Sequence, residues 1–299
     1  HEQAQEIIKG KEHKFSNEIN TLNTIAKTLR RKRLNNGALN IESSEVRFQL
    51  NEEGFPVGTF IKVSKEAHQL IEEFMLLANK HVAIKMGKPQ KNKMISPFIY
   101  RIHEDPKEEK LSDLKIYLQA MGYEWVRIKK KPISFSLNEV MKKAKEKKEL
   151  HLIAPMIIRS MSKAVYSSDN IGHYGLAFQY YTHFTSPIRR YADLIVHRKL
   201  WNAINEKSSH SKEQLEYTCN HISKMEKQAV DAERASIKYM QVLFLGEKIG
   251  TQFSGVISGL TDWGIFVELD NNKCEGMIPL NSIKAVSYTH LRAHETRSD

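Results

Sequence analysis

Between His173 and Leu200 the chain reads HYGLAFQYYTHFTSPIRRYADLIVHRKL, which interleaves aromatic rings with cations. The arginine pair Arg189 and Arg190 stands among Tyr180, Tyr181, His183, Phe184 and Tyr191. Single-stranded RNA offers phosphates to cations and flat bases to rings, so a groove that holds it combines both residue types. Arginine suits phosphate better than lysine because its planar fork can grip two oxygens at once. The stretch therefore favours a site for a single-stranded polynucleotide.

The composition is consistent with such a partner. Among 299 residues, 46 Lys and Arg outweigh 35 Asp and Glu, which gives a formal net charge of +11. A surplus of this size indicates a polyanionic partner, either nucleic acid or an anionic membrane surface, although a merely basic protein has the same composition. Cys219 and Cys274 are far apart, which predicts no disulfide and favours a reducing cytoplasm. No apolar run approaches the ~18 residues of a membrane span.

Both ends of the sequence look artificial. The chain opens on His1 instead of Met, inside a helical pattern. The last residues, 286–299, resemble the conceptual translation of a sequencing adapter, and we exclude them from the fold prediction. The sequence therefore reads as a fragment of a longer product.

Apolar periodicity and turn residues predict an α+β chain. Helices are expected over 19–34, 64–87, 110–124, 153–167, 188–204 and 211–246. Ser64 is the expected N-cap of the second of these, and Pro187 the expected first-turn residue of the fifth. Strands are expected twice within 37–63 around a turn at Glu53-Gly54, once within 98–106, and repeatedly within 250–283. The lysine-rich run 127–150 is typical of a solvated helix face.

Several stretches together resemble the ribonuclease II (RNB) family. They are LIEEFMLLAN (70–79), YRIHEDP (100–106), IRSMSKAVYS (158–167), GHYGLAFQYYTHFTSPIRRYADL (172–194) and AERA (232–235). The β-rich segment from residue 250 to 283 is similar to the S1-type RNA-binding domain, an OB fold. The resemblance implies the C-terminal part of an RNB catalytic domain over 1–243, with helices packed on a mixed sheet. A truncated S1-type domain would follow over 246–285, and the adapter-like tail over 286–299.

The resemblance also implies an activity, namely processive 3′→5′ hydrolysis of single-stranded RNA to nucleoside 5′-monophosphates by a cytoplasmic monomer. By the family's pattern Arg189 stabilises charge at the scissile phosphate, as an arginine does in an in-line displacement. Glu233 matches a position near the reaction centre. The residues expected to contact RNA are Arg190, Glu72, Glu73, Tyr191, Ser186, Trp263, Phe266 and Phe253.

The alternatives to these roles are structural. Glu72, Glu73 and Glu233 could be carboxylates on helix surfaces. At least one of the rings Trp263, Phe266 and Phe253 is expected in the core of the barrel, although each stacked base would contribute about 1–3 kcal/mol. His173, His183 and His197 are expected to be hydrogen-bonded scaffold without a chemical role.

The family uses Mg²⁺ held by clustered aspartates, and this sequence has no D-x-D grouping. Its aspartates are scattered at Asp105, Asp113, Asp169, Asp193, Asp231, Asp262, Asp270 and Asp299. Mg²⁺ requires carboxylates that converge on an octahedral site. We therefore expect the ligands upstream of this sequence, and we expect these 299 residues alone to bind RNA weakly and to turn over little or none.

Three other classes compete with an exoribonuclease. A non-catalytic RNA-binding module of the S1 or OB type explains the charge and the β-rich segment, but not the long stretch around Arg189. An inactive family member that holds RNA as a scaffold explains all but the retention of Arg189 and Glu233. A peripheral membrane protein is the weakest reading, because no basic amphipathic helix carries an aromatic face.

Overall fold

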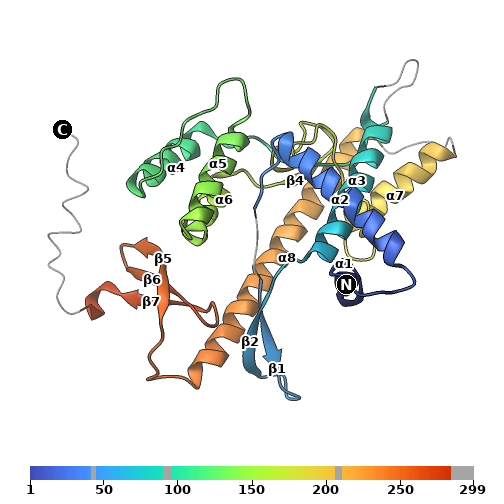
Figure 1. Cartoon of the computed structure of the whole chain (residues 1–299). Coiled ribbons are helices and arrows are strands. Elements are labelled where there is room, and N and C mark those ends of the chain that lie inside the picture. Colours follow the sequence, from blue (N-terminus) through green and yellow to red (C-terminus); the bar gives the residue numbers. More distant parts are fainter. Residues whose placement is uncertain (42–44, 90–95, 206–210, 284–299) are drawn as a thin grey trace, which may run out of the picture. The chain divides into compact units, whose positions relative to one another are not determined.

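The computed structural model describes residues 1–41, 45–89, 96–205 and 211–283. These residues divide into two compact units (Figure 1). The first comprises 1–43 and 64–230, and the second comprises 44–63 with the chain from 231 onward. The division falls at residue 230, inside a helix predicted to be continuous, whereas the sequence placed a domain boundary near 243–246.

Helices dominate the first unit. Helix α1 (Glu2–Ile8), α2 (Ser16–Asn35) and α3 (Glu66–Gly87) pack against one another. The helices α4 (Glu108–Ala120), α5 (Ile133–Glu146) and α6 (Leu150–Ser160) share a second core built around Leu118, Leu137 and Ile153. The lysine-rich run belongs partly to α5, which buries Leu137, Val140 and Ala144 along one face and leaves most of its lysines in solvent.

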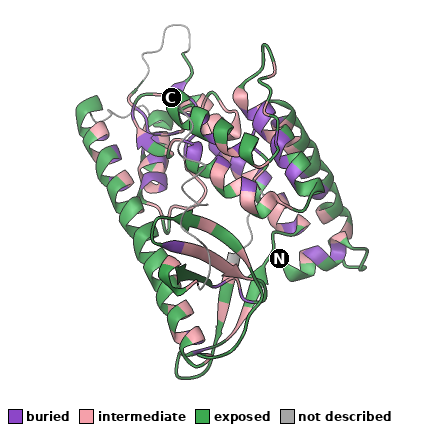
Figure 2. Ribbon diagram, turned by 90° about the vertical axis from the view of Figure 1, so that its left-hand side faces the viewer, coloured by how far each residue is buried: buried purple, intermediate pink, exposed green. Residues whose placement is uncertain are grey.

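A third cluster supports the motif around the arginine pair. It joins α3 to the antiparallel strands β3 (Tyr100–Ile102) and β4 (Val165–Ser167), and to α7 (Tyr191–Ile204) and the start of α8 (Lys212–Gly246). Phe98, Ile99 and Val196 are almost completely buried there. Figure 2 shows that buried residues are concentrated in this helical unit. The arginine motif therefore lies at the edge of a well-packed core.

Three local predictions were wrong. The helix expected over 153–167 ends at Ser160, because Met161 is extended and the following residues pair with β3 as strand β4. Helix α7 begins at Tyr191, and Pro187 lies in the turn before it. The N-cap of α3 is Lys65 instead of Ser64, and the ring nitrogen Nδ1 of His68 accepts the backbone N–H of Lys65 at 3.1 Å.

The second unit contains the β-rich segments. Strands β1 (Glu45–Leu50) and β2 (Pro56–Lys62) form an antiparallel hairpin. Strands β5 (Gly255–Thr261), β6 (Gly264–Leu269) and β7 (Glu275–Pro279) form an antiparallel sheet with β6 at its centre. The α+β class is confirmed, although the strands in the described ranges form small antiparallel sheets in place of one extensive mixed sheet. Cys219 and Cys274 are both free and buried.

Gly37 ends α2 in a conformation that only glycine adopts without strain. Its φ is +96°, and a Cβ at this position would lie 2.6 Å from the ring of Phe135 on α5. Gly10 has a similar φ of +106° with open space around it. A side chain at Gly10 would therefore cause backbone strain alone, whereas one at Gly37 would cause the same strain and a clash with Phe135.

Replacing Gly37 by Ala should destabilise the first unit more than replacing Gly10 by Ala. Left-handed backbone strain costs about 1 kcal/mol in either variant, and the clash with Phe135 adds about 1–3 kcal/mol in Gly37→Ala only. Urea denaturation of both variants measures the difference. Equal losses would show that the Phe135 ring moves aside without cost.

Candidate functional site

The two adjacent arginines of the motif have different surroundings. Arg190 forms a two-pronged ion pair with Asp193, with Nη2 at 2.9 Å from Oδ1 and Nε at 2.8 Å from Oδ2. The carboxylate of Asp193 is fully buried, and its Oδ1 also accepts the backbone N–H of Ser186 at 2.8 Å. Arg189 is exposed, and the described residues offer it no ion pair. Asp193 therefore fixes the turn on both sides and leaves Arg189 directed to solvent.

The segment before this turn is anchored to β3 and α3. Thr182 donates its hydroxyl to the carbonyl of Ile99 at 2.7 Å, and the carbonyl of Tyr181 accepts the N–H of Arg101 at 2.9 Å. Asn79 accepts the N–H of Phe184 at 2.9 Å and donates to the hydroxyl of Tyr181 at 3.2 Å. These bonds satisfy the polar groups of a buried loop, so the turn that carries Arg189 starts from a fixed platform.

The histidines of the motif are hydrogen-bonded within the fold, as expected. His183 pairs through Nδ1 with the hydroxyl of Tyr166 at 2.7 Å, and His197 pairs through Nε2 with the carbonyl of Phe184 at 2.8 Å. Burial, with Arg190 and Arg101 nearby, lowers the pKa of His183 to about 2. Burial also lowers the pKa of His173 to about 3, helped by the neighbouring His103. His173 and His183 are therefore neutral near pH 7.

The adjacent carboxylates Glu72 and Glu73 on α3 also differ in their exposure to solvent. Glu73 is 3% exposed and pairs with the guanidinium of Arg33, which comes from the basic cluster at the end of α2. Glu72 is half exposed, and Arg33 lies 3.8 Å away from it. The structure thus gives Glu73 an internal role in joining α2 to α3. Glu72 is the member of the pair that remains accessible to RNA.

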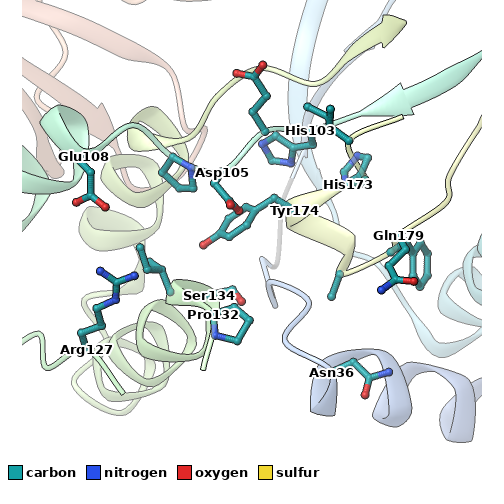
Figure 3. A pocket seen from close by; sticks show the side chains of 17 residues that line it. Asn36, His103, Asp105, Glu108, Arg127, Pro132, Ser134, His173, Tyr174 and Gln179 are labelled. Atoms are coloured by element: carbon teal, nitrogen blue, oxygen red, sulfur yellow. The ribbon is translucent and has the colours of Figure 1, made fainter. Parts of the chain in front are cut away.

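A cavity of about 720 Å³ brings together two of the motifs noted in the sequence (Figure 3). His103 and Asp105 come from the YRIHEDP stretch, and His173 and Tyr174 follow Gly172 in the long motif. In Figure 3 the Tyr174 ring lies between Asp105 and Ser134. Burial raises the pKa of Tyr174 to about 12, so its hydroxyl stays protonated. This cavity was not predicted from the sequence, although the resemblance of both stretches to family motifs was a usable signal.

The remaining predicted residues lie in the second unit. Glu233 is an exposed residue of α8. Trp263, in the turn between β5 and β6, is 79% exposed, and Phe253 is 39% exposed. Phe266 lies within β6 opposite Met277 and is partly buried. Trp263 and Phe253 are thus accessible to a base, whereas Phe266 contributes part of its ring to the sheet. Pro279 ends β7.

The described residues do not form a Mg²⁺ site. No group of three or more His, Cys, Asp or Glu side chains converges within them. Asp193, the buried aspartate of the motif, is already neutralised by Arg190. The donors present therefore do not fit the hydrated, oxygen-rich octahedral coordination of Mg²⁺.

Comparisons with known proteins identify the family. The RNB domain matches residues 1–206, and the S1 RNA binding domain matches residues 247–298. The chain belongs to the RNB family. Ribonuclease R of Aquifex aeolicus is 35% identical over 283 residues, which cover 93% of this chain and 39% of that protein. The RNB chain described here thus spans about two fifths of the length of this curated relative.

Solved structures agree with this family. The structure of RNase R from Mycoplasma genitalium in complex with ribose methylated single-stranded RNA superposes with a TM-score of 0.85 at 26% identity. The match covers 95% of this RNB chain and 45% of that chain. The complex of the same protein with double-stranded RNA gives a TM-score of 0.82 at 26% identity, over 93% of this chain and 50% of that one.

No helix among the described residues has the length and apolar character to cross a membrane.

The two partly buried histidines, His173 and His183, make stability depend on pH. The pKa values of His183 and His173 in the folded state lie below the ordinary histidine value of about 6.5. Below pH 6.5 the two histidines therefore bind protons in the unfolded chain but not in the folded chain. The free energy of unfolding falls as pH decreases.

We expect a loss of up to about 2 kcal/mol per histidine between pH 6.5 and pH 5. Chemical denaturation at a series of pH values should show this decrease in the free energy of unfolding. His183→Gln should remove the part of the decrease that His183 contributes, roughly half of the total from the two histidines. His81→Gln, at an exposed position of α3, is the matched control. A slope that does not change in His183→Gln would contradict the assignment of a neutral buried ring.

The α3 carboxylates give a second prediction. Glu73→Ala leaves the guanidinium of Arg33 buried without its main partner and should cost about 3–5 kcal/mol of stability. Glu72→Ala should change stability by less than about 0.5 kcal/mol, because its side chain is half exposed. Thermal or urea unfolding of the two variants provides the comparison. Similar effects of the two would refute the division of roles between them.

Proposed function

We propose that this RNB chain is part of an exoribonuclease that hydrolyses single-stranded RNA from its 3′ end to nucleoside 5′-monophosphates. Membership of the RNB family and the similarity to proteins named Ribonuclease R support the reaction class. The solved relative with single-stranded RNA supports the substrate. Processive action, Mg²⁺ as cofactor, a cytoplasmic location and a monomeric state are parts of the same proposal.

The observation that carries the proposal is the exposure of Arg189 on a turn held by Asp193. Hydrolysis of a phosphodiester develops negative charge on the non-bridging and leaving oxygens, and a preorganised cation stabilises this charge most in the transition state. Arg190 cannot move freely to this task, since its fork is committed to Asp193. We therefore assign transition-state stabilisation to Arg189, and to Arg190 the positioning of the turn.

The other predicted residues support binding. Tyr191 is 55% exposed directly after the arginine pair and offers its ring to a base. Ser186 donates its backbone N–H to Asp193, so its contact with RNA would come through its hydroxyl. In the second unit Trp263 and Phe253 present rings to single-stranded bases, while Glu233 keeps the role near the reaction centre that the family pattern implies.

A non-catalytic RNA-binding role is the second candidate. The matched S1 RNA binding domain and the exposed ring of Trp263 favour binding, and the described residues contain no converging acidic cluster. The two candidates make different predictions for labelled poly(A) in the presence of Mg²⁺. Binding without shortening by the 299 residues is expected under both, whereas a longer protein that carries the upstream aspartates should shorten RNA only under the first.

In such a longer, active protein, Arg189→Ala should lower the single-turnover cleavage rate by about a hundredfold or more. Affinity for the RNA should fall by only about tenfold, the effect of one lost charge-assisted bond. Rates come from shortening of end-labelled RNA, and affinities from filter binding.

Arg159→Ala, which removes an exposed cation from α6, is the control and should leave both quantities unchanged. Equal losses in rate and affinity for Arg189→Ala would contradict a transition-state role. An unchanged rate would remove Arg189 from the mechanism.

A further inference from the structure

A second set of polar side chains lines a cleft of about 320 Å³ between α7 and α8. This volume falls within the range of pockets that hold small ligands. Arg189 and Arg190 do not line the cleft. The proposed function therefore leaves most of this cleft unexplained.

Helical spacing places the α7 side chains of the cleft on one face. Tyr191, Ile195, Arg198 and Asn202 follow one another at steps of three or four residues along α7. The facing turns of α8 contribute Gln214 and Thr218, and the Thr218 hydroxyl donates to the carbonyl of Gln214 at 2.9 Å. The cleft therefore has a ring at one end and amide or hydroxyl groups along its length.

The charges that line the cleft have one sign. Arg198 is exposed, Lys199 is 5% exposed, and the described residues that line the cleft include neither Asp nor Glu. The only acid of α7, Asp193, is held by Arg190. On α8, Glu216 accepts the N–H of Ser168 at 2.6 Å. Arg198 therefore faces a cleft whose described lining holds no carboxylate, and its guanidinium fork matches two oxygens of a phosphate.

We propose that this cleft binds the phosphate group of a nucleotide, with Arg198 on the phosphate and Tyr191 against the base. Asn202 and Gln214 supply donors and acceptors suited to sugar or base edges. The phosphate is either the monoester of a mononucleotide or a diester within an RNA strand, because both present the same oxygens to Arg198. The proposal does not require catalysis at Arg189, since binding in this cleft persists in a chain that turns nothing over.

The test uses the 299-residue chain with isotope-labelled isoleucine methyl groups. Ile195 lines the cleft and reports local binding by its methyl chemical shift. The probes are AMP, adenosine, inorganic phosphate and an oligoadenylate without terminal phosphates. The variants are Arg198→Ala and Arg198→Lys, with Arg159→Ala as the control for loss of an exposed cation.

AMP should shift the Ile195 methyl signal, and Arg198→Ala should weaken this binding by about tenfold or more, the fold-change for one charge-assisted hydrogen bond. Arg198→Lys should retain part of the affinity, and Arg159→Ala all of it. A response to AMP but not to the oligoadenylate identifies a mononucleotide as the source of the phosphate. An Arg198-dependent response to the oligoadenylate identifies the RNA strand.

Three results would overturn the proposal. They are adenosine binding as tightly as AMP, AMP affinity that Arg198→Ala does not change, and the absence of any shift at Ile195 with all four probes. Failure of the proposed exoribonuclease is recognised separately, by intact labelled poly(A) in the presence of the longer protein. An Ile195 shift in a chain that never cleaves RNA would leave the cleft assignment standing.

Discussion

The arrangement around the arginine motif depends on one buried carboxylate. Asp193 has no exposed surface, and its Oδ1 accepts hydrogen bonds from Nη2 of Arg190 and from the backbone N–H of Ser186, while Nε of Arg190 lies 2.8 Å from Oδ2 as an ion pair. A buried carboxylate is stable only when such partners replace water, so the three groups must fold together. Asp193 also lies in the first turn of α7, where the helix dipole favours a negative charge. The same interaction thus starts the helix and fixes the turn.

The arginines Arg101 and Arg190 each have a carboxylate partner. Arg101 pairs with Glu226 at 2.6 Å and lies over the Tyr166 ring, 4.6 Å from its centroid. Arg190 is taken by Asp193. His183, which is partly buried near Arg190 and Arg101, stays neutral because a further positive charge there would be poorly solvated and repelled. A neutral imidazole forms one hydrogen bond with the Tyr166 hydroxyl and adds no charge beside the two ion pairs.

Much of this organisation could be predicted from the sequence, since long periodic patterns determine where α2, α3 and α8 lie. The errors came where a short segment had two possible structures. Val165–Ser167 continues an apolar pattern that also suits a helix, and only its pairing with β3, more than 60 residues earlier, selects a strand. Pro187 is compatible with both a first helical turn and a β-turn, and the bonds to Asp193 decide for the turn.

The site was predictable by residue type but not by role. The motif singled out both Arg189 and Arg190, and the resemblance singled out both Glu72 and Glu73. Sequence position alone cannot tell which member of each pair faces inward, because this depends on a partner supplied by the fold. For Arg190 that partner, Asp193, is three residues ahead, a spacing that the sequence does show. For Glu73 it is Arg33, from a different helix and 40 residues away.

The two pairs show a common principle. Adjacent like charges repel, and in each pair one member is held in a short ion pair, the partly buried Arg190 by Asp193 and the buried Glu73 by Arg33, while its neighbour is more exposed. The paired member gains its stability from a fixed partner, and in doing so it fixes the backbone from which its neighbour projects. An exposed charge on such a backbone loses less conformational entropy on binding than one on a loose loop. The ion pairs of Arg190 and Glu73 therefore hold the backbone at Arg189 and Glu72 in place, which is what the proposed roles of Arg189 and Glu72 in contacting RNA require.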